Sequence, residues 1–336
     1  MKSTSKDVAR RAGLSQSTVS RVINGKDGVS PELRTLVYQA MEDVGYIPNA
    51  LARSLITQRT QVIGLLVSNI TNPFFAQLTE SVTEHARGRG YSVMLVVIPV
   101  RARDDRGAYA LQARMLAEHR VAGLILTSTP VADKDSLLKL SSPFPIVGIR
   151  PGKAPFDTVS IDHRGGTRIA TQHLINQGRR HLGFIGGRSD SMAGAAHQAG
   201  FEVALRKPEN RNVHTAFVSH GEFTYESAYE RTLEIVCSRV QFDGLVVAAD
   251  TMALGCIDAL TDAGIAVPTD VSIVGFDDIP AASYRSVQLT TVRGSANLVA
   301  KKAVDFLIER AEGYDGPPRM RSIASSLVVR RSCGHP

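Results

Sequence analysis

The sequence lacks the features that mark several protein classes. No stretch approaches the ~20 consecutive apolar residues of a membrane-spanning helix, and the first residues, MKSTSKDVARR, contain no apolar signal core. The cysteines, Cys237, Cys256 and Cys333, lie far apart and form no C-x-x-C pair, which excludes a disulfide framework and argues against a structural zinc site. We therefore expect a cytoplasmic protein that holds no metal or cofactor and binds no membrane.

Catalytic signatures are missing as well. The sequence contains none of the motifs G-x-x-x-x-G-K-[ST], G-x-G-x-x-G, G-x-S-x-G and H-E-x-x-H, and its nine histidines form no pair at i, i+4. Two carboxylates, Asp277 and Asp278, are adjacent in sequence, so we interpret them as structural residues whose side chains diverge. The sequence therefore does not predict an enzyme.

What the sequence does have is an uneven charge distribution. Its 336 residues are 43 % hydrophobic and 21 % charged, a balance typical of a folded chain with two or three cores. The formal net charge is +7, of which residues 1–60 contribute +4 through nine Lys/Arg and five Asp/Glu. A small basic head on a nearly neutral body suggests a polyanionic partner, although a merely solvated basic terminus would fit the charge alone.

Three short helices are expected in the basic head. Residues 6–12 form an amphipathic helix that Gly13 ends, and Ser15 is a suitable N-cap for the run SQSTVSRVIN. Ser30 and Pro31 supply a cap and a first-turn proline for a third helix. This arrangement predicts an all-α helix-turn-helix unit. The apolar positions expected to face its core are Val8, Ala9, Ala12, Val19, Val22, Ile23, Leu33, Leu36, Val37, Ala40, Met41 and Val44.

The second helix of this unit would expose a polar face that contains no acid. With the apolar residues directed inward, hydroxyl, amide and guanidinium groups remain, and these suit contacts with phosphates and base edges. A small solvated helix could carry the same residues without binding anything. The residues expected on this face are Gln16, Ser17, Thr18, Ser20, Arg21 and Asn24.

The head also resembles a known family. The run DVARRAGLSQSTVSRVINGKDGVSPELRTLVYQAMEDVGYIPNALARSL resembles, almost position by position, the head of the LacI/GalR family of bacterial transcriptional regulators. Both A-x-x-A-G-[VL]-S-x-x-T-V-S-R-V-[IV]-N and the downstream G-Y-x-P-N-x-x-A-R-x-L are present. The resemblance implies that bases in the major groove are read by Gln16, Ser17 and Arg21. It implies that the DNA backbone is anchored by Thr18, Ser20 and Asn24.

A linker at residues 48–59 is expected to follow the helix-turn-helix unit of residues 1–47. Its segment PNALARSL favours a helix, but about eight residues are too few for a stable isolated helix, so folding on docking is expected. By resemblance this is a hinge helix that enters the minor groove with its dimer mate, where Leu55 would wedge between base steps. Asn49 and Ala52 are further implied DNA contacts. An ordinary linker packed on a neighbouring domain is the alternative.

From Val62 onward, apolar runs alternate with amphipathic ones. Continuous apolar strands separated by helices predict parallel sheets covered on both faces, and two series of similar length predict two doubly wound α/β lobes. A ligand would lie at the carboxyl ends of the strands, in the cleft between the lobes. The expected strands are 62–67, 91–97, 123–128, 144–149, 158–162, 182–187, 214–219, 244–249 and 271–276.

The body resembles the effector-binding core of the same family, which is related in fold to periplasmic sugar-binding proteins. The matching segments include NITNPFF, IDHRGGTRIATQHL and VSIVGFDD, and the whole resemblance covers essentially residues 5–331. It implies a core over residues 60–331 whose chain crosses three times between the lobes. The expected lobes are an N-lobe of residues 60–161 with 292–319 and a C-lobe of residues 162–291 with 320–331.

Candidate effector-binding residues are taken from the predicted strand ends and from the resemblance. Carboxylate, amide and guanidinium groups beside an aromatic face are what a polyhydroxylated ring requires. We expect Asp250 to accept hydrogen bonds from two ligand hydroxyls, although it could instead cap the helix TMALGCIDAL, and Asp162 could be a turn residue. The full set is Asn72, Phe74, Ser128, Arg150, Asp162, His197, Phe223 and Asp250.

Two positions depart from the family's pattern. His197 stands where family members usually have an arginine that binds the effector, and Ala249 stands where an asparagine commonly precedes the aspartate. An imidazole cannot replace a bidentate guanidinium, which weakens any inference about the ligand. A sugar or sugar derivative is the expected effector. A sugar acid, a nucleoside or another small metabolite is the alternative, and Arg150 could hold an anionic group.

Three functions remain open from the sequence. The leading hypothesis is a sequence-specific DNA-binding repressor that binds a pseudo-palindromic operator as a homodimer, under the control of a small-molecule effector. A solute-binding protein is disfavoured by the basic head, and an α/β enzyme by the missing catalytic motifs. The tail RRSCGHP carries no heptad helix like those of tetrameric relatives, so a dimer is expected.

Overall fold

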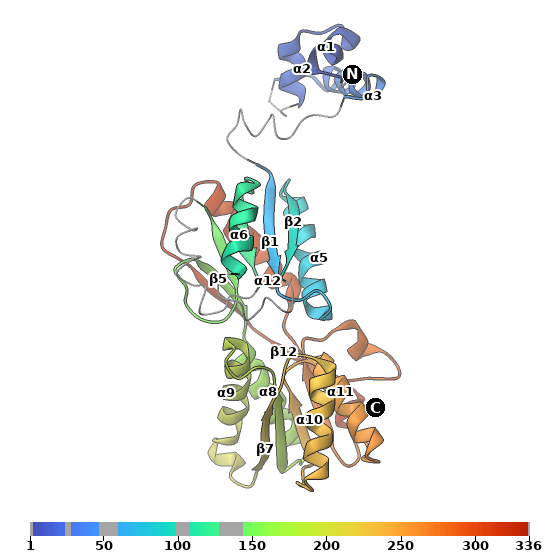
Figure 1. Ribbon diagram of the computed structural model, residues 1–336, viewed down its shortest axis with the longest axis vertical. Coiled ribbons are helices and arrows are strands. Elements are labelled where there is room, and N and C mark those ends of the chain that lie inside the picture. Colours follow the sequence, from blue (N-terminus) through green and yellow to red (C-terminus); the bar gives the residue numbers. More distant parts are fainter. Residues whose placement is uncertain (1–2, 24–27, 47–59, 99–107, 128–143, 335–336) are drawn as a thin grey trace. The chain divides into compact units, whose positions relative to one another are not determined.

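The chain forms two compact units, Met1–Thr60 and Gln61–Pro336 (Figure 1). The computed structural model describes residues 3–23, 28–46, 60–98, 108–127 and 144–334. Each unit buries a hydrophobic core of its own, so each is described by itself.

The first unit contains the helices α1 (Ser5–Ala12), α2 (Gln16–Ile23) and α3 (Pro31–Asp43). Gly13 ends α1 with a φ of 65°, a left-handed backbone angle that glycine adopts at little cost. The Ser30 hydroxyl accepts a hydrogen bond from the backbone N–H of Leu33 at 3.4 Å, and Pro31 occupies the first turn of α3. The short helices expected from the sequence are therefore present, with the expected caps.

A small core holds these helices together. A 2.6 Å ion pair also joins Arg11 of α1 to Asp43 at the end of α3. The prediction that Leu36 faces the core is wrong, because its side chain is 45 % exposed. Val37 and Ala40 are the buried residues of α3, and Leu36 lies outside this buried face. The buried residues are Val8, Ala9, Ala12, Val19, Val22, Val37 and Ala40.

The second unit contains two sheets, and we call each sheet with its covering helices a lobe. Among the described residues the first sheet has six strands in the order β2-β1-β3-β4-β5-β11, and its neighbouring strands are parallel. Most of these strands are buried along their length, as expected for a parallel sheet with both faces covered. They are β1 (Val62–Val67), β2 (Ser92–Val97), β3 (Gly123–Leu126), β4 (Ile146–Ile149), β5 (Asp157–Ile161) and β11 (Met320–Ile323).

The sheet of the second lobe repeats this arrangement. Its order is β7-β6-β8-β9-β10-β12, parallel except for β12, which runs antiparallel to β10. The strands are β6 (His181–Gly186), β7 (His214–His220), β8 (Gly244–Val247), β9 (Ser272–Phe276), β10 (Thr290–Arg293) and β12 (Ser326–Val328).

Helices cover both faces of each sheet. In the first lobe, α5 (Pro73–Gly88) and α12 (Ala296–Ala311) pack side by side on one face, and α6 (Ala108–Glu118) covers the other. In the second lobe, α8 (His163–Asn176) pairs with α9 (Met192–Leu205), and α10 (Tyr225–Cys237) pairs with α11 (Asp250–Asp262) on the opposite face. Short 3-10 helices occur at Pro208–Asn210, Pro280–Ser283 and Arg331–Cys333. The predicted fold class, a helical head with two doubly wound α/β lobes, is confirmed.

The chain crosses between the two sheets three times. β5 leads into α8, β10 leads into α12, and β11 is followed by β12. Two expected lobe boundaries are wrong by a few residues: residues 292 and 293 belong to β10 of the second lobe, and Met320–Ile323 pairs with β5 of the first. β11 is a largely exposed edge strand without an apolar run, so only its pairing with β5 assigns it to a sheet.

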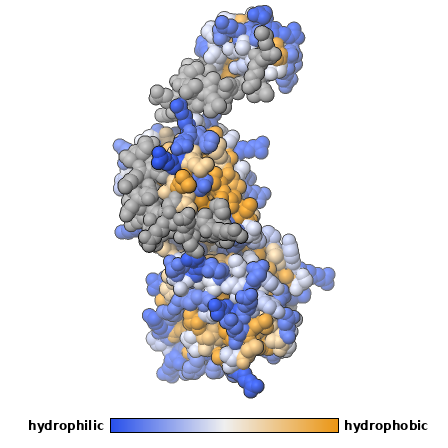
Figure 2. Space-filling model, in the orientation of Figure 1, coloured by the Kyte–Doolittle hydropathy of each residue, from blue (hydrophilic) through white to orange (hydrophobic). Residues whose placement is uncertain are grey.

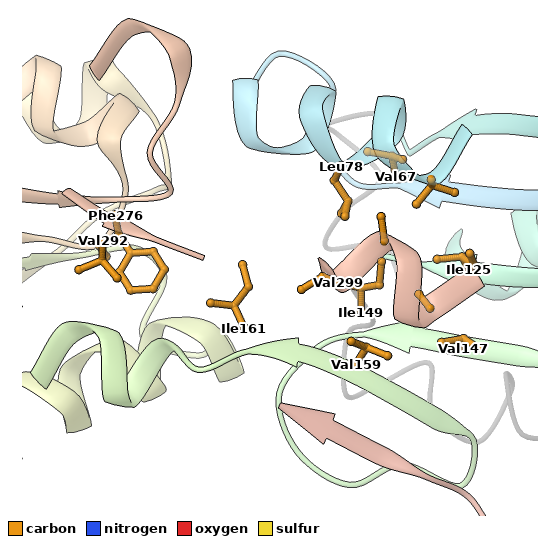
Figure 3. Packing of buried hydrophobic residues seen from close by; sticks show 14 of the residues in the cluster. Val67, Leu78, Ile125, Val147, Ile149, Val159, Ile161, Phe276, Val292 and Val299 are labelled. Atoms are coloured by element: carbon orange, nitrogen blue, oxygen red, sulfur yellow. The ribbon is translucent and has the colours of Figure 1, made fainter. Parts of the chain in front are cut away.

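Buried side chains form one continuous cluster across both lobes. Figure 3 shows Ile161 between Phe276 and Val292 of the second lobe and Val299 of the first. Gly294 lies directly against Ile161, since a Cβ at Gly294 would lie 2.6 Å from the Ile161 Cγ2. The first and second crossings therefore touch each other through side-chain packing.

A buried carboxylate joins distant parts of the first lobe. Asp157, at the start of β5, accepts hydrogen bonds from Arg310 at 2.9 Å and from Arg319 at 2.8 Å, and its side chain is fully buried. Burial opposes its ionisation, but the hydrogen bonds from the two guanidinium groups outweigh that effect and lower the pKa of Asp157. The two arginines also stack on the ring of Tyr314. This network holds α12 and the start of β11 against β5.

We predict that Asp157→Asn destabilises the chain strongly. The substitution removes the carboxylate partner of Arg310 and one of the two carboxylate partners of Arg319, which keeps Glu309, and breaking such a buried pair costs roughly 3–5 kcal/mol. Asp305→Asn is the matched control, because the exposed Arg89–Asp305 pair of the same lobe is worth at most about 1 kcal/mol. Urea unfolding of the three chains should show this order, and equal midpoints for the two variants would contradict it.

Candidate functional site

The α2 surface of the head presents short polar side chains. Gln16 and Ser17 are exposed, and Thr18 is partly buried. The Gln16 amide donates to the Ser5 hydroxyl at 3.1 Å, and the Ser15 hydroxyl lies 2.7 Å from that of Ser17 and 2.8 Å from that of Thr18. These contacts hold the first turn of α2 in place with its polar groups at the surface.

Ser20 and Arg21 continue this face, and both are exposed. A Cβ at Gly28 would lie 3.1 Å from the Arg21 Nη2, so this residue leaves room for the guanidinium beside the start of α3. No acid is present in the first turn of α2. Four predicted DNA contacts, Asn24, Asn49, Ala52 and Leu55, lie outside the described residues.

In the first lobe, Asn72 follows β1 and caps α5. Its side-chain oxygen accepts a hydrogen bond from the backbone N–H of Phe74 at 2.9 Å, and only 7 % of the residue is exposed. Phe74 is partly buried and packs edge to face on Phe75, with ring centroids 5.4 Å apart. Of the predicted ligand residues in this lobe, Ser128 lies outside the described residues.

Arg150 follows β4 and reaches the second lobe. Its guanidinium contacts the thioether sulfur of Met192, the first residue of α9. Burial lowers the pKa of Arg150. Gly152 lies beneath this contact with a φ of 81°, and a Cβ there would lie 2.5 Å from the Met192 Cε. Arg150 is thus placed at the junction of the two lobes.

In the second lobe, the predicted site residues also follow strand ends. The Asp162 carboxylate accepts a hydrogen bond from the backbone N–H of Gly165 at 2.8 Å, which makes it the N-cap of α8. Phe223 follows β7 and packs over Gly187, at the end of β6. A shallow, open surface pocket of about 400 Å³ is lined by Arg188, Ser189, Asp190, His220, Gly221, Glu222, Ser227 and Arg231.

His197 lies inside the second lobe and is not positioned to hold a ligand as an arginine would. It is 2 % exposed, its Nδ1 lies 2.8 Å from the Thr167 hydroxyl, and its ring contacts Phe276 at 4.6 Å. The His163 ring lies 4.7 Å from it. Burial lowers the pKa of His197 well below its usual value and that of His163 to about 4, so both imidazoles are neutral at pH 7. His197 is therefore held inside its own lobe by Thr167 and Phe276, and its contact with an effector stays a prediction.

Asp250 is also held by the protein itself. It is fully buried, and its two carboxylate oxygens accept from the Thr291 hydroxyl at 2.5 Å and from the backbone N–H of Ile279 at 2.9 Å. Each carboxylate oxygen can accept a second hydrogen bond, so the expectation that Asp250 accepts from two ligand hydroxyls stays a prediction. The alternative of a helix cap is wrong, since the N-cap of α11 is Ala249 and Asp250 is its first helical residue.

Asp277, which the sequence analysis interprets as structural, is a further candidate for the site. It directly follows β9, it is partly exposed, and its φ of 110° is unusual for a residue with a side chain. Burial of its carboxyl, followed by the charge of Asp250, raises the pKa of Asp277. Its neighbour Asp278 is structural, as expected, because it binds Arg293 at 2.6 Å and Arg330 at 2.7 Å. The strand-end rule that selected the other candidates would have selected Asp277.

Comparison with known proteins relates this geometry to a family. Residues 4–49 match the family model "Bacterial regulatory proteins, lacI family", and residues 171–333 match the periplasmic binding protein-like domain. The chain is 34 % identical over 334 residues to the HTH-type transcriptional repressor PurR of Haemophilus influenzae strain PittEE, covering 98 % of both chains. It is 34 % identical over 335 residues to the HTH-type transcriptional regulator CelR of Thermobifida fusca, covering 97 % of this chain and 96 % of the relative.

The chain belongs to the lacI family. Among solved structures, a lac repressor dimer bound to operator and the anti-inducer ONPF matches with a TM-score of 0.86 and 27 % identity, over 99 % of both chains. A CelR–cellobiose complex matches with a TM-score of 0.73 and 30 % identity, over 98 % of this chain and all of that one. The expectation of a LacI-family DNA-binding regulator of transcription is thereby confirmed. None of the described helices combines the length and the apolar character needed to cross a membrane.

We predict that Asp250 makes stability depend on pH. Burial raises the pKa of Asp250 to about 7, against about 3.9 for an unfolded aspartate. Between these values the folded chain holds a proton that the unfolded chain has released, so this stabilisation is present at pH 4 and is lost as the pH rises to 7. The sign is opposite for His163 and His197, whose contribution is lost as the pH falls below about 6.5.

The difference between the wild type and Asp250→Asn isolates the carboxyl, because asparagine keeps the size and an acceptor but cannot titrate. The free energy of unfolding of the wild type, relative to the variant, should fall by about 3 kcal/mol from pH 4.5 to 7.5. Urea unfolding at four pH values measures this. A difference that is independent of pH would show that Asp250 is not a buried proton holder.

Proposed function

We propose that this family member represses transcription by binding a pseudo-palindromic operator as a homodimer, with its DNA affinity set by a small metabolite held between the two lobes. In this proposal residues 1–47 bind DNA and residues 48–59 form the hinge and linker. Residues 60–331 bind the effector and dimerise. The DNA partner implies that the protein acts in the bacterial cytoplasm.

The observation that carries the proposal is the exposed α2 face of the head. Hydroxyl, amide and guanidinium groups meet there without an acid, on the helix that follows the tight turn at Gly13. In helix-turn-helix proteins, this second helix enters the major groove and its side chains contact base edges. Base reading by Gln16, Ser17 and Arg21, and backbone contacts by Thr18 and Ser20, remain predictions.

The effector part of the proposal is supported by two relatives and by the strand-end residues. One matching structure holds cellobiose, and another, with a TM-score of 0.72 and 25 % identity over 81 % of this chain, is a complex with D-xylulofuranose. Among the described candidates, Arg150 of the first lobe and Phe223 and Asp277 of the second offer polar and aromatic groups to such a ligand. We therefore infer a sugar or a sugar derivative that contacts both lobes.

Dimerisation is supported by the exposed apolar residues of the first lobe. Figure 2 shows hydrophobic side chains around the edge strand β2 on the face in view, and Leu95 of that strand is 42 % exposed. Leu111 and Met115 of α6 are 59 % and 46 % exposed. Exposed apolar surface of this kind is typical of protein–protein interfaces.

A solute-binding protein, the second candidate, would not need the basic head.

A gel-shift experiment with the full chain and the DNA upstream of its own gene tests the proposal. We expect a discrete complex that random DNA of the same length does not compete away at equal concentration. Competition by random DNA at equal concentration would favour a non-specific basic head instead.

Arg21→Ala should weaken binding to the operator more than non-specific binding to DNA. A base-reading arginine contributes roughly 1–3 kcal/mol of discrimination, so the affinity for the operator should fall by that amount while random DNA is much less affected. Arg10→Ala removes the same charge from α1, where the side chain is 82 % exposed and paired with Asp7, and serves as the control. Fluorescence anisotropy on both DNAs measures the four affinities, and equal losses for Arg21→Ala would identify a phosphate contact.

The chain should sediment as a dimer at micromolar concentration. One recognition helix reads only a few base pairs, so two copies on a two-fold site are needed for specificity. Leu95→Glu places a charge on the edge strand and should shift the equilibrium toward monomer. Val240→Glu, at a 36 % exposed position of the second lobe, should not. A monomeric wild type bound one to one to DNA would contradict the proposal.

A further inference from the structure

Several arginines of the two lobes form ion pairs with carboxylates, whereas Arg179 donates to the Ser272 hydroxyl and to backbone carbonyls. The guanidinium groups of Arg293 and Arg330 bind Asp278, and Arg188 binds Asp190 at 2.8 Å. Arg310 and Arg319 bind Asp157. Arg150 forms no ion pair with a carboxylate in the described part of the chain, and its guanidinium instead contacts the Met192 sulfur, a weak acceptor.

This guanidinium is only partly hydrated. Arg150 is partly buried, and burial is the cause that lowers its pKa. A charge that is withdrawn from water without a counter-charge is unfavourable, so the folded chain keeps Arg150 at a cost. An anionic ligand that accepted hydrogen bonds from both of its terminal nitrogens would offset that cost.

The residue that Arg150 touches begins a helix. Met192 is the first residue of the fourteen-residue α9, and Gly152 lets it lie directly against the β4 turn. The first turn of α9 contains no acid, and its Gly194 N–H is capped by the Ser191 hydroxyl at 2.9 Å. A helix N-terminus carries partial positive charge, so it disfavours the guanidinium beside it and favours an anion placed between the two.

The acids at the strand ends of the second lobe do not supply that anion. The Asp162 carboxylate caps α8, and Asp278 is neutralised by two arginines. Burial raises the pKa values of Asp250 and Asp277, which opposes their ionisation. The Asp162 and Asp278 carboxylates are thus engaged by the protein, and burial disfavours the charged forms of Asp250 and Asp277.

We infer that Arg150 binds a negatively charged group of the effector, a carboxylate or a phosphate, between the end of β4 and the N-terminus of α9. The inference rests on the proposed function, since it names the chemical class of the ligand in the same site. The inference limits the expected effector to a sugar derivative with an anionic substituent. The Met192 thioether, which now contacts the guanidinium, would give way to the anion.

The test uses the full chain and two minimal probes, inorganic phosphate and acetate, titrated at constant ionic strength against chloride. At least one should raise the melting temperature of the wild type, because a ligand that binds only the folded chain stabilises it by mass action. Arg150→Gln should abolish the shift, and Arg150→Lys should keep part of it. Arg206→Gln, which removes an exposed arginine paired with Glu202 at the far end of α9, should behave as the wild type.

A second titration identifies the anion. D-Glucose, D-glucuronate and D-glucose 6-phosphate are compared by calorimetry, and the acid or the phosphate should bind at least about tenfold more tightly than glucose in the wild type only. The proposal is overturned if no anionic probe acts on the wild type, or if Arg150→Gln responds as the wild type does. Operator binding is measured in parallel with and without each probe, because an effector either strengthens or weakens DNA binding. Its absence from the wild type under every condition would refute the proposed function but would leave the anion titration readable.

Discussion

In each sheet of the core, at least one strand comes from a part of the sequence that follows strands of the other lobe. β11 belongs to the first sheet although it follows β6–β10 of the second sheet in the sequence. β12, a few residues further on, belongs to the second sheet. The crossings are tied to one another: the Asp162 N–H donates to the Ile323 carbonyl at 2.9 Å, and the Ser325 hydroxyl donates to the Asp162 carbonyl at 3.2 Å. Neither lobe is therefore a continuous stretch of sequence, and a change in one lobe must reach the other through these segments.

The same architecture explains why the sequence does not distinguish structural from ligand-binding roles for polar residues at strand ends. Parallel strands end at one edge, where a fold needs helix caps and a ligand needs donors and acceptors. Asp162 serves the fold as a cap, and Asp250 binds residues 29 and 41 positions further along the chain. A carboxylate whose partners lie on other strands becomes part of the packing. A carboxylate that its neighbours leave partly exposed, such as Asp277, is instead a candidate for ligand binding.

The sequence predicted the helices and strands better than the strand pairings and side-chain contacts. β1, β9 and α3 lie within a residue or two of their expected bounds, because an apolar run or a cap at each end is a local signal. β11 has no such signal, since three of its four residues are exposed and only its pairing with Asp157–Ile161 identifies it. The contacts of His197 were not predicted for the same reason. Its hydrogen-bond partner Thr167 lies thirty residues earlier, on a different helix.

His197 and Arg150 both affect where positive charge lies in the core. Replacing an arginine by His197 removes a cation from the second lobe, and the imidazole there is buried and neutral. Arg150 supplies a cation from the first lobe, at the N-terminus of a helix of the second. A ligand held on both sides of this junction binds one arrangement of the lobes better than another, and only that difference can change the affinity for DNA. A ligand that bound both arrangements equally would leave the regulator unchanged, however tightly it bound.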